Sequence, residues 1–209
     1  MSEENIRSGE GLAYIPDLGS EEENNRDFLP KTKRGVPEEF SPRDRKILKQ
    51  EFLKVKDYCR VILEIGTARH EKNSSTRVLL RLKRPKTFYF GVDLLEKPFL
   101  KEDRNQRIYF FQTNSSKLDL ILNGIREASG TTKIDFLFID GYHSVKQILD
   151  DWRFASYVDQ NGVIVIHDSN EHPGPVELLK AIRAGGLFTV KKYFEDRMDD
   201  WGIAVVKRI

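Results

Sequence analysis

The sequence predicts an α/β protein with a doubly wound, mostly parallel sheet of about seven strands. Short apolar runs rich in β-branched and aromatic residues recur along the chain, and several of the segments between them are long enough for helices. The runs are almost continuously apolar, which is typical of parallel strands covered on both faces. The last two runs are separated by only a polar turn, which indicates an antiparallel C-terminal hairpin at the sheet edge.

Each expected strand is an apolar run that ends near a polar residue. In chain order the runs are CRVILEIG (59–66), TFYFGVDL (87–94), RIYFFQTN (107–114), KIDFLFIDG (133–141), GVIVIHDS (162–169), FTVKKYF (188–194) and GIAVVKRI (202–209). The first five alternate with helical segments and are the expected parallel strands. The final two form the expected hairpin.

Helices are expected at four places. The first begins at Ser41, where Ser-Pro-Arg-Asp supplies a capping hydroxyl, a proline at the first helical position and an acid in the first turn. The others are Ser74–Lys83, Leu118–Ser129 and Ser144–Val158, and the last carries an apolar stripe at helical spacing. Asp150 and Asp151 are expected on its solvated face.

Residues 1–40 differ from the rest of the chain. They include GSEEENNRD and few regularly spaced apolar residues, so we expect an irregular or partly disordered N-terminal arm. A solvated tail and a lid over a site are both compatible with this composition. Residues 41–209 are expected to form one domain.

Composition limits the function. The 35 basic and 33 acidic residues leave a formal net charge of +2, which disfavours a nucleic-acid partner. The single cysteine, Cys59, indicates a reducing and hence cytoplasmic setting. The N-terminus is polar and unlike a signal peptide, and no apolar run approaches the roughly 20 residues that span a membrane, so no membrane partner is expected. A homo-oligomer remains compatible with the sequence.

Polar residues end most of the expected strands. Because ligands bind beyond the carboxyl ends of the strands in such sheets, these residues predict a site at one edge. They are Glu64, Asp93, Asn114, Asp140, His167 and Asp168.

The loop after the first strand favours a nucleoside ligand. Gly66 and the small Thr67 and Ala68 allow a ligand to approach the backbone, although the loop is not a G-x-G-x-x-G phosphate loop. Asp93, at the end of the second strand, is placed to accept hydrogen bonds from ribose hydroxyls. Taken singly, Gly66 fits a tight turn and Asp93 fits a helix cap equally well.

Several motifs together resemble a known family. LEIGTA, GVD, FIDGYHSVKQILDDW, NGVIVIHDS and WGIAVVKR are similar to class I S-adenosylmethionine-dependent methyltransferases, over residues 58–209. The resemblance is greatest to the metal-dependent small-molecule and sugar O-methyltransferases with an I-D-G-x-H … H-D pattern. It implies a Rossmann-like fold, S-adenosyl-L-methionine as cofactor, a small-molecule acceptor and Mg²⁺. Two departures are Asn161-Gly162 for a Gly-Gly pair, and residues 69–71 where relatives have a second glycine.

The resemblance also implies residue roles. Cofactor-binding residues would surround methionine, ribose and adenine in chain order: Glu64, Gly66, Thr67 and Ala68, then Asp93 and Leu94, then Asn114 and Ser115, together with Asp140. Metal ligands would be Asp140 and Asp168, with Ser169 or Asn170 as a third. Catalysis would fall to His143 as general base and to Asp140.

These residue types suit methyl transfer to a hydroxyl. A divalent metal held by carboxylates lowers the pKa of the acceptor, and a histidine can remove its proton near neutral pH. The structural alternatives stay open: Asp140 as a helix cap, His143 as a helix-start residue and Asp168 as a turn residue. His167 is expected to face away from Asp168 by strand alternation and to be structural.

Three rival functions are compatible with parts of the sequence. The basic stretches Lys31–Lys56 and Arg77–Lys86 would suit a methyltransferase acting on nucleic acid or protein. The altered first loop would suit a non-catalytic cofactor-binding homologue. A metal-dependent hydrolase is weakened by the small number of aligned carboxylates.

Overall fold

The computed structural model describes residues 40–67, 73–195 and 200–209. The predicted arm lies outside the described residues except for Phe40, and so does the loop segment that contains Ala68 and residues 69–71. Among the helices of the described ranges, none has the length and apolar character needed to cross a membrane.

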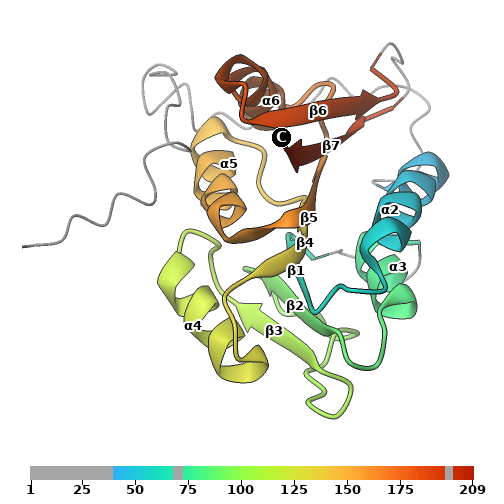
Figure 1. Cartoon of the computed structure of the whole chain (residues 1–209), viewed down its shortest axis with the longest axis vertical. Coiled ribbons are helices and arrows are strands. Elements are labelled where there is room, and N and C mark those ends of the chain that lie inside the picture. Colours follow the sequence, from blue (N-terminus) through green and yellow to red (C-terminus); the bar gives the residue numbers. More distant parts are fainter. Residues whose placement is uncertain (1–39, 68–72, 196–199) are drawn as a thin grey trace, which may run out of the picture.

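A seven-stranded sheet in the order β3-β2-β1-β4-β5-β7-β6 forms the centre of the molecule (Figure 1). Strands β1 to β5 pair in parallel, whereas β7 is antiparallel to both β5 and β6. The predicted fold class and C-terminal hairpin are therefore confirmed. The strands are β1 (Val61–Ile65), β2 (Phe88–Asp93), β3 (Ile108–Gln112), β4 (Ile134–Ile139), β5 (Val158–His167), β6 (Phe188–Tyr193) and β7 (Ile203–Arg208).

Strand order reverses between β1 and β4, which lie side by side although two strands separate them in the chain. The connections from β1 and β4 leave toward opposite sides, so their carboxyl ends border the crevice in which ligands bind in doubly wound sheets. This edge carries the polar strand ends noted in the sequence.

Helices cover both faces of the sheet (Figure 1). One layer contains α2 (Pro42–Val55) and α3 (Ser75–Leu82), and the other contains α4 (Leu118–Ser129), α5 (Val145–Trp152) and α6 (Pro173–Gly185). Helix α5 is shorter than expected because a 3₁₀ turn, η1 (Arg153–Tyr157), follows it. Helix α6 was not among the helices expected from the sequence.

Local signals explain where the helices begin. Ser41 caps α2 in a capping box: its hydroxyl accepts from the Asp44 N–H, and the Asp44 carboxylate accepts from the Ser41 N–H. Pro42 and Pro173 occupy the first positions of α2 and α6, where the missing N–H costs nothing.

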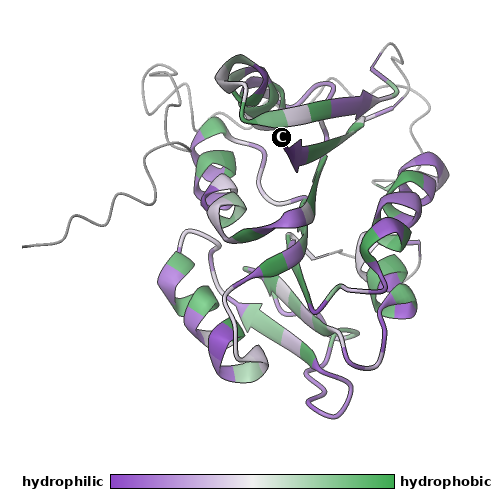
Figure 2. Cartoon of the chain, viewed as in Figure 1, coloured by the Kyte–Doolittle hydropathy of each residue, from purple (hydrophilic) through white to green (hydrophobic). Residues whose placement is uncertain are grey.

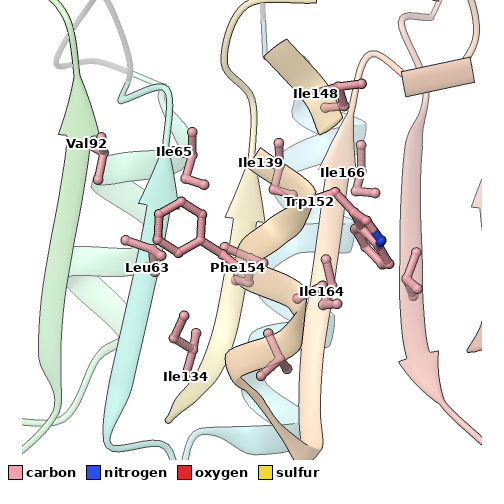
Figure 3. Packing of buried hydrophobic residues seen from close by; sticks show 14 of the residues in the cluster. Leu63, Ile65, Val92, Ile134, Ile139, Ile148, Trp152, Phe154, Ile164 and Ile166 are labelled. Carbon is pink, nitrogen blue, oxygen red and sulfur yellow. The ribbon is translucent and has the colours of Figure 1, made fainter. Parts of the chain in front are cut away.

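Side chains from β1, β4 and β5 interleave with those of α5 and η1 to form the larger core (Figure 3). Figure 2 shows the apolar residues concentrated on the central strands and on the inner sides of the helices. Trp152 and Phe154, at the junction of α5 and η1, are almost fully buried. They fix the end of α5 against the sheet, and this also holds the loop between β4 and α5.

Candidate active site

Gly66 joins the end of β1 to the end of β4. Its φ is +78°, and a Cβ added there would overlap the backbone carbonyl of Asp140. Its N–H donates to Val92 O at 2.9 Å, and the Asp140 N–H donates to Ile65 O at 2.8 Å. Glycine is needed here because the chain passes against its own backbone, which places Asp140 beside the first loop.

Asp93 ends β2 with both carboxylate oxygens held in place. Oδ2 lies 3.0 Å from the buried Lys97 Nζ and accepts from the Thr67 hydroxyl at 3.3 Å, and Oδ1 accepts from the Leu95 N–H at 2.9 Å. Thr67 is thus tied to Asp93. The side chain of Leu94 is 60% exposed. Asp93, which is predicted to bind the ribose, is therefore held in one orientation by neighbouring residues of the chain.

Glu64, in β1, is fully buried. It accepts a hydrogen bond from the Ser75 hydroxyl at 2.6 Å and a second from the Tyr89 hydroxyl. Burial raises the pKa of Glu64 to about 7, against the opposing effect of these two donors. Its contacts therefore connect β1 to β2 and to α3.

Replacing Glu64 by glutamine is expected to change how stability depends on pH. Since the folded pKa is raised, the folded state binds more protons than the unfolded state between about pH 4.5 and 7, and stability falls as pH rises through this window. Glutamine removes this contribution. The free energy of unfolding of the variant, relative to wild type, should therefore rise by up to about 3 kcal/mol over the window.

Urea titrations at pH 4.5, 6 and 8 measure this difference. Glu127→Gln, at an exposed position of α4, is the matched control and should show no such trend. A constant difference between Glu64→Gln and wild type at all three values would contradict the raised pKa.

Asp151 is a buried acid that the sequence did not predict. It was expected on a solvated face, yet it is fully buried and accepts from the Ser115 hydroxyl at 2.5 Å and from the Gln147 side chain at 3.0 Å. Burial raises its pKa to about 7. The prediction was wrong for Asp151 because residues 147 and 151 turn inward toward the loop after β3. Ser115, predicted to lie near adenine, is oriented by this acid.

Asn114, the other predicted adenine neighbour, closes the turn after β3. Its side-chain Oδ1 accepts from the Ser116 N–H at 2.8 Å.

Asp150, unlike Asp151, is partly exposed to solvent, and its Oδ1 atom lies 3.7 Å from the Nη1 atom of Arg153.

Asp140, His167 and Asp168 converge beyond β4 and β5. The Nδ1 atom of His167 lies 3.2 Å from Asp140 Oδ1 and 3.2 Å from Asp168 Oδ1. The expectation that His167 faces away from Asp168 was therefore wrong. The strand ends at His167, and Asp168 adopts a left-handed conformation with φ +55°, so alternation no longer applies between them.

His143 lies on the other side of Asp168. Its Nε2 atom is 2.6 Å from Asp168 Oδ2, and its ring centroid is 4.0 Å from that of His172. Burial lowers the pKa of His143, but the neighbouring Asp168 outweighs it and the net shift is upward. Burial would raise the pKa of Asp168, yet His167 and His143 hold it well below its usual range.

His172 occupies the N-cap position of α6. Its ring stacks on Trp201, with centroids 5.6 Å apart, and the Gly174 N–H donates to His143 O at 3.0 Å. The start of α6 is therefore packed onto the loop that carries His143.

Ser169 and Asn170 follow directly. Ser169 is fully buried, and its hydroxyl has no hydrogen-bond partner within the described ranges. The Asn170 amide instead donates to Phe194 O and Asp200 O, which ties this loop to the β6–β7 connection.

The donor set fits a divalent cation. Asp140, His167 and Asp168 each offer one atom, and these atoms lie within 4.8 Å of one another; the same holds for His143, Asp168 and His172. A buried carboxylate, Asp168, and a partly exposed one, Asp140, together with imidazole nitrogens are an N/O ligand set typical of divalent metals. Ser169, the next residue in the chain after Asp168, has a buried hydroxyl without a hydrogen-bond partner among the described residues.

No family model matches the sequence, and no curated protein does. Solved structures match it. The MycE methyltransferase from the mycinamycin biosynthetic pathway, in complex with Mg, SAH and mycinamycin VI, aligns with a TM-score of 0.58 at 18% identity over 78% of this chain. The O-methyltransferase TomG from Streptomyces achromogenes, involved in tomaymycin synthesis and in complex with SAM, aligns with a TM-score of 0.55 at 18% identity over 80% of each chain. The chain has the fold of these enzymes.

The chain spans about half the length of the MycE structures, because the alignment covers 48% of them. The shared part comprises most of this chain. The likeness agrees with the Rossmann-like fold that the sequence motifs implied.

The structure brings the predicted residues into two groups. Glu64, Gly66, Thr67 and Asp93 surround the ends of β1 and β2, and Asp140, His143 and Asp168 gather at the ends of β4 and β5. The sequence did not predict that His167 neighbours the carboxylates, that Asp151 and Asp44 are buried, or that Lys97 pairs with Asp93. The signal for Asp44 was its capping motif, which gave no indication of a second contact.

Proposed function

We propose that the protein is an S-adenosylmethionine-dependent O-methyltransferase that methylates a hydroxyl of a sugar or other small molecule with the help of a divalent metal. The observation that carries the proposal is the position of His143, 2.6 Å from a buried carboxylate that also faces Asp140 and His167. MycE and TomG, which share the fold, are described as methyltransferases. The MycE complex holds Mg and SAH, and the TomG complex holds SAM.

The cofactor would lie along the ends of β1 and β2. Asp93, fixed by Lys97 and Thr67, presents a carboxylate suited to the two ribose hydroxyls. Ser115, in the loop after β3, is held by Asp151. Positioning supplies much of the rate, because the sulfonium is already a good leaving group for in-line displacement.

The acceptor hydroxyl would lie beyond β4 and β5. Asp140 and Asp168 would hold a divalent metal, which when bound lowers the pKa of the acceptor and orients its oxygen. Asp168 Oδ2 lies 2.6 Å from one ring nitrogen of His143, Nε2, so in this proposal the other, Nδ1, takes the proton from the acceptor. Within this proposal Asp168 orients His143, and His143 removes the proton.

Calorimetric titration with S-adenosylmethionine and with S-adenosylhomocysteine, each with and without Mg²⁺, tests the proposal. We expect dissociation constants in the micromolar range, and at least a tenfold loss of affinity in Asp93→Ala because the ribose loses its acceptor. Asp119→Ala, an exposed acid in the first turn of α4, is the control and should bind as wild type does. If neither S-adenosylmethionine nor S-adenosylhomocysteine bound, the methyltransferase assignment would be overturned.

A further inference from the structure

Asp44 belongs to helix α2, which lies in the layer opposite α4, α5 and α6. Asp44 reaches the same edge of the sheet as Asp140 and Asp168. It is fully buried, and its Oδ2 atom lies 3.3 Å from His167 Nε2. The same oxygen accepts from the Ser41 backbone N–H at 3.0 Å, and this N–H, which does not depend on the Ser41 side chain, fixes where the carboxylate points. Its other oxygen, Oδ1, is buried and has no hydrogen-bond partner among the residues that the structure describes.

The ring of His167 is buried, with carboxylates near both of its nitrogens. Nε2 lies 3.3 Å from Asp44 Oδ2, and Nδ1 lies 3.2 Å from both Asp140 Oδ1 and Asp168 Oδ1. Phe40 packs edge-on against the ring, with centroids 5.1 Å apart. The 3.2 Å separations are close to the ~3 Å spacing of adjacent donor atoms around an octahedral ion with bonds of about 2.1 Å.

We propose that Asp44 is a positioning residue that holds His167 Nδ1 as the third metal ligand beside Asp140 and Asp168, and that this nitrogen makes the site select a first-row transition-metal dication such as Mn²⁺ or Co²⁺ over Mg²⁺. The proposal rests on the metal site of the proposed function. Imidazole nitrogen suits transition metals, whereas Mg²⁺ takes oxygen ligands. A carboxylate on the far nitrogen of a ligating histidine fixes the tautomer and raises its basicity.

Mn²⁺ binding tests the ligand directly and needs neither cofactor nor turnover. Titration with Mn²⁺ followed by electron paramagnetic resonance gives the affinity, competition with Mg²⁺ gives the preference, and pulsed measurements detect coupling to a ligating ¹⁴N. We expect Mn²⁺ to bind at least a hundredfold more tightly than Mg²⁺, with ¹⁴N coupling present. In His167→Glu the coupling should disappear and the preference should fall at least tenfold.

The role of Asp44 is tested with a matched pair of variants. Asp44→Asn removes the negative charge that faces His167 and should weaken Mn²⁺ binding by about 10- to 100-fold, as loss of such outer ligand partners does. Ser41→Ala removes the capping hydroxyl but leaves the carboxylate in place, so it should bind Mn²⁺ as wild type does. This control separates a loss of helix capping from a loss of positioning.

Wild-type protein that binds Mn²⁺ without ¹⁴N coupling would overturn the proposal, as would an Asp44→Asn variant with unchanged Mn²⁺ affinity. The cofactor titration without metal separates this failure from that of the proposed function. Binding of S-adenosylmethionine together with an all-oxygen Mn²⁺ site overturns only the ligand assignment, whereas absence of cofactor binding overturns the function and leaves the Mn²⁺ result standing.

Discussion

Replacing Asp168 by asparagine is expected to lower kcat/KM for methyl transfer by between about 10²- and 10⁴-fold, the range that a positioned general base contributes. Asp168 contacts both His143 and His167, so one substitution removes the group that orients the base and one of the two carboxylates proposed to hold the metal. Asparagine keeps the size of the side chain and tolerates the left-handed backbone at φ +55°. The loss is therefore chemical rather than conformational.

Transfer of a radiolabelled methyl group to a panel of sugars and phenols measures the effect of Asp168→Asn, alongside calorimetric titration of the metal. Glu177→Gln, at a surface ion pair with Lys180 on α6, is the control and should retain activity. Unchanged turnover in Asp168→Asn, with its circular dichroism also unchanged, would exclude the assigned role.

Gly66→Ala should produce the largest loss of stability among the substitutions considered. Two costs add: the positive φ of +78°, about 1–2 kcal/mol for a residue with a Cβ, and the overlap of that Cβ with the backbone of Asp140. Backbone cannot move aside as a side chain can, so we expect a total of about 3–5 kcal/mol, in the range of severe core defects. Displacement of Asp140 should also weaken binding of cofactor and metal.

Comparison with Gly130→Ala isolates the second cost, the overlap with the backbone of Asp140, because Gly130→Ala incurs only the first. Gly130 has nearly the same φ, +76°, but a Cβ there would meet nothing within 4 Å. Urea unfolding of both variants should show Gly66→Ala to be destabilised by at least ~2 kcal/mol more than Gly130→Ala, in the range of overpacking costs. Equal losses would mean that the contact between Gly66 and β4 is not what requires glycine.

The sequence predicted those features that depend on local chemistry. Apolar runs with polar ends located the strands, and the Ser41 capping signal located the start of α2, because neither depends on distant residues. Asp140 and Asp168 could be placed at one edge because parallel strands share a direction. Helix α6 was missed although Pro173 is a helix-start signal.

Buried polar contacts could not be predicted, because they depend on the relative placement of distant elements. Asp151 is buried only because the loop after β3 delivers Ser115 to it, 36 positions away in the chain. Asp44 contacts His167 only because α2 crosses the sheet at that point. The period of a helix indicates which residues share a face, but it does not indicate which faces carry a polar group that needs a partner.

The placement of β7 between β5 and β6 has a consequence for the protein during its synthesis. Strand β5 leaves the ribosome with β4 on one side and an open hydrogen-bonding edge on the other, and that edge closes only when Ile203–Arg208 has emerged. Open apolar edges promote intermolecular strand pairing. A nascent chain arrested before Ile203 is therefore expected to bind chaperones and to aggregate on release, whereas one arrested far enough beyond Arg208 to expose β7 should resist proteolysis.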